Sequence, residues 1–457
     1  MAKAYKFKGL LTQGGWMSPA YVYLDDNGRI THLSAIPQTE IHYEYVRGYA
    51  LPGFQNAHSH AFQYVMAGLA ESHQREDDFW SWRDLMYRVA LTIDPDQMEA
   101  IAAMAYAEMV RHGYSHVAEF HYLHHDKNGE TYSNRCEMGE RLISAADKAG
   151  IKMTLIPIFY QKGGFDSTAR SDQRRFISKT VDHYLELLSE SKRFTEASES
   201  ANYAMGIHSL RAVDHQDIVE CFEHRDSQLP LHMHIAEQTK EVEDCLGHLK
   251  ARPVDWLCDN CQVDEYVHLV HATHITETEI KKLTSHQANV VLCPSTEANL
   301  GDGIFPLMSF QANAGKWCIG TDSHIGVSPL EELRLLDYGQ RLTHRSRNIF
   351  KNPSLGQPGL SIIEMTYNIG QQAMNNASTD LFEIGKAFDA VIYDANWPLL
   401  ASTSLENLLP TIVYSADSSA AMGTIINGQW VVERNQHVNM ASIQNNFTKV
   451  IRALDIR

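Results

Sequence analysis

The sequence predicts an α/β fold, a TIM-like (β/α)8 barrel with a small β-sandwich domain built from both ends of the chain. Apolar, strand-like runs alternate eight times with longer amphipathic stretches, and ionisable residues gather at the ends of the runs, which is typical of such a barrel. Short strand patterns around turns at both chain ends predict the second domain. We therefore assign 51–375 to the barrel, and 1–50 and 376–457 to the two parts of the β-sandwich.

The eight strand-like runs begin apolar and end in polar or ionisable residues. They span 49–60, 114–122, 151–160, 203–211, 229–237, 267–274, 289–296 and 317–324. Between the first two, "DQMEAIAAMAYAEMVRHG" places Ile101, Met104 and Met109 on one helical face, and Gly113 suits the helix end. Because parallel barrel strands all end at one rim, the ionisable residues predict an active-site mouth there.

Both chain ends have a different pattern from the middle. Near the N-terminus, "AYVYLDDNGRITHLSAI" reads as two short strands around an Asn-Gly turn, and the tail has similar strand patterns in "FDAVIYDANWPLL" and "MGTIINGQWVVER". Both ends look rich in strands and poor in helices. The simplest arrangement joins them in one β-sandwich beside the barrel.

Charge and composition exclude several classes of partner. The formal net charge is -17, from 39 Lys plus Arg against 56 Asp plus Glu, so nucleic acid or an anionic membrane would be repelled over most of the surface. No signal-peptide-like or membrane-spanning apolar run is evident. The seven scattered cysteines fit reduced thiols better than a disulfide framework. We therefore expect a cytoplasmic protein that acts on a small molecule.

Two histidines one residue apart, His58 and His60 in "NAHSH", follow the first strand run. With 24 His in 457 residues, roughly 1.2 such pairs are expected by chance, and His232 and His234 form another, so position must decide. Residues i and i+2 of a strand share a face, so His58 and His60 would both project into the mouth. The later run ends add the metal-ligand candidates His234, His271 and Asp322.

Each of these residues also has an ordinary structural interpretation. A single strand histidine is often a hydrogen-bonded core residue, and an aspartate before a helix is often its N-cap. Their gathering at the ends of runs one, five, six and eight favours a site for a divalent ion instead.

This arrangement resembles the amidohydrolase superfamily, in its mononuclear deaminase-like branch. The resemblance rests on HxH after run one, HxxE from His234 to Glu237, His271 after run six and Asp322 after run eight. Run four, "YAMGIHSLR", lacks the bridging lysine of binuclear members, which implies one metal ion. Longer segments between residue 56 and about 336 resemble the formimidoylglutamate deiminases within that superfamily, including "NAHSHAFQ", "EFHYLHHD", "GIHSLRAV", "CPSTEANLGDGIFPL" and "GTDSHIGVSPLEELRLL".

The resemblance implies roles for the residues at the mouth. His58, His60, His234 and Asp322 would hold one divalent ion per chain, with zinc as the default and iron or manganese as alternatives. The ion would activate water, and Glu237 would take the proton of that water and pass it to the departing nitrogen. We expect His271 to orient the nucleophile and stabilise charge, with a role as fifth ligand as the alternative. Asp322 counts as catalytic as well as metal-binding.

The implied substrate is N-formimino-L-glutamate of histidine degradation, which would yield N-formyl-L-glutamate and ammonia. Its two carboxylates need local cations in this acidic chain. Arg211 follows run four and could grip a carboxylate bidentately. Further substrate-binding candidates are Gln63, Arg83, Tyr122 and His208. Arg83 could instead lie on a solvated helix face, Tyr122 could cap the barrel rim, and Gln63 could be a polar loop residue.

Two other functions stay open at this point. Another amidohydrolase, acting on a heterocycle of the cytosine, guanine or adenosine type, would use the same metal chemistry but prefer aromatic stacking surfaces to arginines. A non-catalytic barrel binding protein is the other alternative, although such proteins usually lose ligands. The resemblance also implies a homodimer. Finally, we expect "CPSTEANLGDG" to form a loop over the mouth, with Gly301 and Gly303 allowing its tight path.

Overall fold

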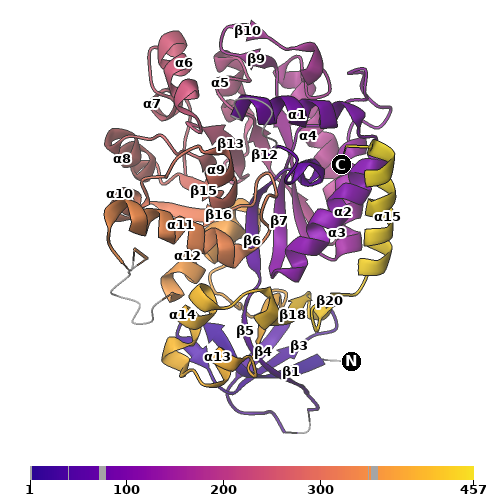
Figure 1. Ribbon diagram of the computed structural model, residues 1–457, viewed down its shortest axis with the longest axis vertical. Helices are drawn as coiled ribbons and strands as arrows, with labels where there is room; N and C mark the ends of the chain where they lie inside the picture. Colours follow the sequence, from indigo (N-terminus) through magenta and orange to yellow (C-terminus); the bar gives the residue numbers. More distant parts are fainter. Residues whose placement is uncertain (1–2, 40, 72–78, 348, 351–358, 457) are drawn as a thin grey trace.

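A computed structural model describes residues 3–39, 41–71, 79–347, 349–350 and 359–456 (Figure 1). Its larger part is a barrel of eight parallel strands in the order β16-β15-β14-β13-β12-β8-β7-β6, with the short β11 (Ala201–Tyr203) paired to β8. The barrel strands are β6 (Phe54–Ser59), β7 (Tyr114–His121), β8 (Lys152–Phe159), β12 (Met205–Ile207), β13 (Leu231–Ile235), β14 (Val267–His271), β15 (Asn289–Leu292) and β16 (Lys316–Ile319). The predicted α/β barrel is confirmed.

Helices alternate with the strands along the chain and pack around the barrel (Figure 1). They are α1 (Phe79–Thr92), α2 (Pro95–Arg111), α3 (Glu137–Ala149), α4 (Val181–Glu196), α5 (His215–His224), α6 (Thr239–Leu249), α7 (Pro253–Asn260), α8 (Glu277–Ser285), α9 (Pro294–Leu300), α10 (Leu307–Ala312), α11 (Pro329–His344) and α12 (Leu360–Ala373). Helix α2 begins where its sequence predicts, because the Asp94 side chain accepts the Gln97 N–H at 2.8 Å and Pro95 occupies the first turn. No helix in the described ranges is long and apolar enough to cross a membrane.

The first and last barrel strands meet through the residues that follow β16. The backbone N–H groups of Thr321 and Asp322 both donate to the His58 carbonyl at 3.0 Å, and the His60 N–H donates to the Asp322 carbonyl at 3.1 Å. Gly320 permits this close approach, since a Cβ there would lie 2.7 Å from Cβ of His58. Barrel closure therefore places three of the predicted ligands side by side.

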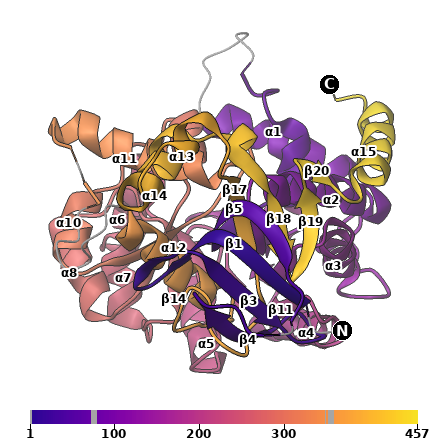
Figure 2. The ribbon, with the colours of Figure 1, turned by 90° about the horizontal axis from the view of Figure 1, so that it is seen from below.

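The two chain ends share one mixed sheet below the barrel, in the order β20-β19-β18-β17-β5-β1-β3-β4, with β2 on β1 (Figure 2). Antiparallel pairing of β17 with β5 joins the C-terminal strands to the N-terminal ones. Its strands are β1 (Lys3–Thr12), β2 (Gly15–Met17), β3 (Ala20–Leu24), β4 (Ile30–Ser34), β5 (Glu44–Pro52), β17 (Ala390–Asp394), β18 (Ala421–Ile426), β19 (Gln429–Glu433) and β20 (Gln436–His437). Both ends thus build one β structure, as predicted.

Two local expectations differ from the structure. The first strand-like run, 49–60, is divided: its first residues end β5 in the terminal sheet, and Phe54 begins β6 in the barrel. The tail also contains helices, namely α13 (Pro398–Ala401), α14 (Leu405–Ser415) and α15 (Met440–Leu454). Helix α15 returns to the barrel and packs against α2, because Ile443, Phe447 and Val450 form an apolar face (Figure 1, yellow).

Candidate metal centre and active site

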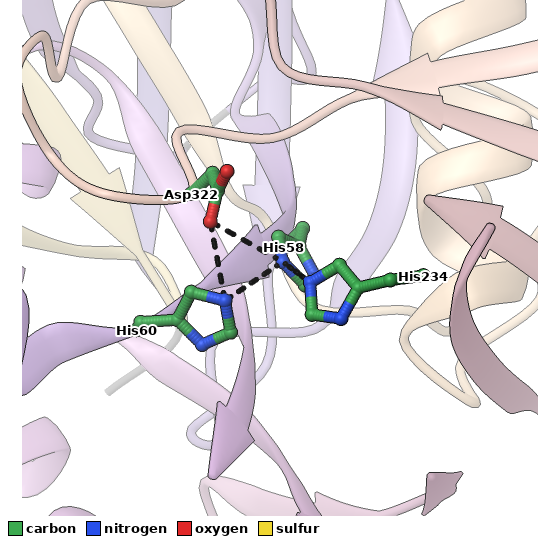
Figure 3. A group of neighbouring side chains, drawn as sticks. All are labelled: His58, His60, His234 and Asp322. Atoms are coloured by element: carbon green, nitrogen blue, oxygen red, sulfur yellow. Dashed lines mark hydrogen bonds and ion pairs between the residues drawn. The ribbon is translucent and has the colours of Figure 1, made fainter. Parts of the chain in front are cut away.

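Three histidines and one aspartate converge at the carboxyl ends of the barrel strands (Figure 3). The Nε2 atom of His58 lies 3.1 Å from Nε2 of His60 and 3.0 Å from Nε2 of His234. Oδ1 of Asp322 lies 3.1 Å from Nε2 of His60 and 3.5 Å from Nε2 of His58. All four side chains are buried. The structure therefore brings the four predicted ligands together from β6 and the residue after it, from β13, and from the segment after β16.

The donor chemistry of this group fits a divalent cation. The Nδ1 atoms of His60 and His234 donate to the backbone carbonyls of Phe120 at 2.8 Å and His208 at 3.1 Å, so each Nε2 directs its lone pair inward. Burial lowers the pKa of His58 to about 3 and that of His234 well below its ordinary value, which keeps both rings neutral. Converging lone pairs beside a carboxylate repel one another unless a cation lies between them.

His271, the last residue of β14, lies beside this group. Its Nδ1 is 3.2 Å from Oε1 of Glu297, and its Nε2 is 3.6 Å from Oδ2 of Asp322 and 3.9 Å from Oε1 of Glu237. Burial by itself would lower the pKa of His271, but the three carboxylates outweigh it and raise the pKa to about 10. His271 therefore faces both the ligand group and the predicted proton carrier.

Glu237 follows β13 and is held by a neighbouring arginine. Nη2 of Arg211 lies 3.1 Å from Oε2 of Glu237, and Nη1 of the same guanidinium lies 3.1 Å from Oε2 of Glu241. Glu241 also accepts the backbone N–H groups of Ala236 and Glu237. Arg211, which the sequence predicts as a substrate contact, is thus paired with two carboxylates of the chain itself and positions Glu237.

One pocket opens onto the ligand group and contains every predicted substrate-binding residue. It is lined by His60, Gln63, Trp82, Arg83, Met86, Tyr87, Tyr122, Tyr160, Phe176, His208, Arg211, His234, Glu237, His271, Leu300 and Asp322. Within it, Nε2 of Gln63 donates to the Tyr122 hydroxyl at 2.8 Å, so these two side chains orient each other. Two guanidinium groups and several aromatic rings therefore share the space above the metal-ligand candidates.

Sequence reasoning missed the residues that hold the ligands in place. Glu119 in β7 accepts the Ser59 hydroxyl at 2.5 Å and the Ala61 N–H at 2.7 Å, and so fixes the chain on both sides of His60. Nε2 of His324 lies 3.1 Å from the same Ser59 hydroxyl oxygen. Ser59, between the two histidines, was the only sign in the sequence of such a supporting contact. Its partner Glu119 lies 60 positions away, so the sequence does not indicate which residue it meets.

Glu297 was missed because its segment was misinterpreted. Part of "CPSTEANLGDG", expected to be a loop, forms helix α9, with Pro294 in its first turn and Gly301 (φ +69) after its end. The helix directs Glu297 at Nδ1 of His271. Gly301, which suggested a loop, here follows the last residue of a short helix.

Comparisons with known proteins identify the family of the chain. Residues 49–431 match the model of the Amidohydrolase family. The chain is 41% identical over 415 residues to formimidoylglutamate deiminase of Pseudomonas aeruginosa, covering 90% of each protein. The crystal structure of an amidohydrolase from Brucella melitensis superposes with a TM-score of 0.92 at 35% identity over 99% of both chains. A zinc-bound adenosine deaminase from Xanthomonas campestris shares the fold, with a TM-score of 0.81, 18% identity and coverage of 99% and 98%.

Proposed function

Because the chain belongs to the amidohydrolase family and is a hydrolase acting on carbon–nitrogen bonds, we propose that its reaction is the hydrolysis of N-formimino-L-glutamate to N-formyl-L-glutamate and ammonia in histidine degradation. The observation that carries this proposal is the placement of Arg83 and Arg211 in the pocket above the ligand group. A substrate with two carboxylates suits two guanidinium groups in a protein whose net charge is -17. The 41% identical relative supports the same substrate.

We assign one divalent ion to His58, His60, His234 and Asp322, and zinc is the expected ion. When bound, it would act as a Lewis acid that lowers the pKa of water from about 15.7 towards ~7, which makes hydroxide available at neutral pH. The inward Nε2 lone pairs and the Asp322 carboxylate support this assignment. Zinc is supported by the metal named for the Xanthomonas campestris protein.

Side chains of the protein transfer the proton and orient the water. Glu237 takes a proton from the attacking water and delivers it to the departing nitrogen, a transfer that contributes roughly 10² to 10⁴ in rate. Its Oε2 is held by Arg211, while Oε1 faces His271. His271, fixed through Nδ1 by Glu297, orients the water and stabilises negative charge as the carbon–oxygen bond forms. The bond from the formimino carbon to its terminal nitrogen then breaks, and ammonia leaves.

The substrate's carboxylates and formimino group need separate contacts. Arg211 and Arg83 bind carboxylates, and the paired Gln63 and Tyr122 hydrogen-bond the substrate near His60. His208 completes the wall between Arg211 and the ligand group.

A heterocycle deaminase is the second candidate, and the aromatic rings of Trp82, Tyr87, Tyr160 and Phe176 in the pocket favour it, because such rings can stack on a base. The test is ammonia release by the purified, metal-loaded protein from N-formimino-L-glutamate, cytosine, guanine and adenosine. We expect turnover of the amino-acid derivative alone. Turnover of a base without the amino-acid derivative would establish the second candidate, and no turnover of any substrate by a folded, metal-loaded chain would favour the binding-protein alternative.

Compartment and assembly complete the proposal. All seven cysteines are free, which supports the reducing cytoplasm as the site of action.

An exposed apolar stripe lies on α11. It consists of Leu335, Tyr338 and Leu342, three and four positions apart, which are 36%, 40% and 79% exposed. A stripe of this kind is self-complementary across a two-fold axis. We expect a homodimer by light scattering that Leu342→Glu converts to monomer. A monomeric wild-type chain would contradict it.

A further inference from the structure

A second group of metal-binding side chains lies next to the first and shares Asp322 with it. The group consists of His271, Cys293 and Asp322, which follow or end the neighbouring strands β14, β15 and β16. A ring nitrogen, the thiol sulfur and a carboxylate oxygen all lie within 4.8 Å of one another. The three residues are 1%, 0% and 5% exposed. Among the residues that the structure describes, no other cysteine belongs to such a group.

The two oxygens of Asp322 are divided between the two groups. Oδ1 faces Nε2 of His60 and His58, at 3.1 and 3.5 Å, whereas Oδ2 faces Nε2 of His271 at 3.6 Å. A carboxylate with its oxygens arranged in this way can contribute one oxygen to each of two cations. The second group therefore does not require the first to give up its ligand atom.

Glu297 fixes both other members of the second group. Its Oε1 accepts the Nδ1–H of His271 at 3.2 Å and the backbone N–H of Cys293 at 2.9 Å. A carboxylate on Nδ1 is the usual partner that leaves Nε2 of a metal-binding histidine directed at the ion. Together with Glu237 and Asp322, Glu297 also surrounds His271 with negative charge that a cation would balance.

We propose that His271, Cys293 and Asp322 form a second, weaker site for a thiophilic divalent cation such as zinc, and that its occupation inhibits the enzyme. Thiolate and neutral imidazole are preferred zinc ligands, and the thiol proton of Cys293 and the Nε2 proton of His271 both pass to solvent as the two metal–ligand bonds form. The site is weaker than the first because it has three protein ligands and a second positive ion nearby. It inhibits because the ion occupies Nε2 of His271, which the proposed reaction needs.

The test uses full-length protein that holds one equivalent of metal, titrated with excess Co²⁺. We expect wild-type protein to bind a second equivalent with near-ultraviolet cobalt–thiolate absorption, and kcat to fall at least tenfold as that equivalent binds. Cys293→Ala keeps the first equivalent and its activity, and loses the second equivalent, the thiolate absorption and the inhibition. The matched control is Cys318→Ala, since Cys318 is a buried cysteine on β16 outside the group, and we expect it to behave as wild-type.

Three results would overturn the proposal: a single equivalent in wild-type protein despite excess metal, a second equivalent without thiolate absorption, or a second equivalent that survives in Cys293→Ala. The first two results are measured on wild-type protein, so they test the proposal even if Cys293→Ala does not fold. Glu297→Gln should weaken the second site by roughly 10-fold or more. Metal content and absorption need no substrate, so failure of the substrate assignment leaves this test intact.

Discussion

Arg211 holds the carboxylate of Glu237, with Nη2 of the arginine 3.1 Å from Oε2 of the glutamate. Glu241, in the first turn of α6, holds the other end of the guanidinium at 3.1 Å and accepts the backbone N–H groups of Ala236 at 3.2 Å and Glu237 at 3.1 Å. Both the backbone and the side chain of Glu237 are therefore fixed. A carboxylate that must carry a proton between two reacting atoms gains from such restraint, because it cannot turn away between the two transfers.

Glu241→Gln tests this restraint. We expect kcat to fall about tenfold to a hundredfold with little change in KM, because hydrogen bonds to charged groups contribute about 1.5–3 kcal/mol and each ~1.4 kcal/mol is a factor of ten. Metal content should stay at the wild-type value. The control is Glu243→Gln, an exposed glutamate on the same helix. Equal kcat values for the two variants would show that Glu241 has no positioning role.

Substitutions at two positions of the site should affect metal content and turnover differently. His58→Ala removes an Nε2 atom from the centre of the ligand group and should lose both metal and activity. Glu237→Gln keeps all four proposed ligands and should retain metal, while turnover falls by roughly 10² to 10⁴. Elemental analysis beside an ammonia assay measures both. Two tightly held ions per active chain would contradict the single-ion assignment, and near-normal turnover of Glu237→Gln would contradict its proton transfer.

The sequence predicts those parts of the site that follow from local periodicity. Strand alternation places His58 and His60 on one face, and the end of a strand run places His234, His271 and Asp322 at one rim, so the barrel rule brings them together. The supporting contacts do not follow from such rules.

Contacts between distant segments depend on barrel radius and strand register, which the sequence does not display. Ser59 meets Glu119 across 60 positions, and Arg211 meets Glu237 across 26. Arg211 was therefore predicted only as a substrate contact. Helix α15 was missed for a related reason: its apolar face, which includes Ile443, has a partner only when the tail returns to α2.

Glu119→Gln should weaken metal binding although Glu119 touches no ion. An amide offers one acceptor oxygen where the carboxylate offers two, and it carries no charge, so the hydrogen bonds to the Ser59 hydroxyl and the Ala61 N–H are both weakened and His60 is less firmly placed. Partners of this kind contribute roughly 10- to 100-fold in metal affinity. Competition with a chelator measures the affinity. Ser59→Ala removes one of the two contacts and should have a smaller effect in the same direction. Unchanged affinity in Glu119→Gln would refute the role.

His116 predicts a pH dependence of stability. The ring is buried in β7 with Nε2 3.0 Å from the Thr154 hydroxyl, and burial lowers its pKa to about 3. An unfolded histidine titrates near ~6.5, so between these values the unfolded chain binds a proton that the folded chain does not. The contribution is complete above pH ~6.5 and is lost as pH falls towards 3.

The variant His116→Gln isolates that contribution. Between pH 7 and pH 5, wild-type protein should lose about 2 kcal/mol more unfolding free energy than the variant, at ~1.4 kcal/mol per pH unit below 6.5. Urea unfolding at both pH values measures the difference. Identical pH dependence in the two proteins would mean that His116 binds its proton equally in both states.

The two pocket arginines should differ in which kinetic constant they control. Arg211→Met removes the partner of Glu237 as well as a proposed carboxylate contact, so kcat and kcat/KM should both fall, with a loss of roughly 2 to 5 kcal/mol in kcat/KM and metal still bound. Lysine at 211 should rescue only in part, because it restores the charge without the planar fork. Arg83 lies over the Tyr87 ring, 5.7 Å from its centroid, and is proposed as a carboxylate contact without a role in holding Glu237. Arg83→Met should therefore chiefly raise KM.

A substrate with one carboxylate separates these roles further. N-formimino-glycine lacks the side-chain carboxylate of the glutamate derivative. If each arginine binds one carboxylate, one of the two KM penalties must disappear on this shorter substrate, because the lost contact was already missing. The kcat penalty of Arg211→Met should persist on both substrates, since it acts through Glu237. Equal KM penalties on both substrates for both variants would contradict the assignment of one arginine to each carboxylate.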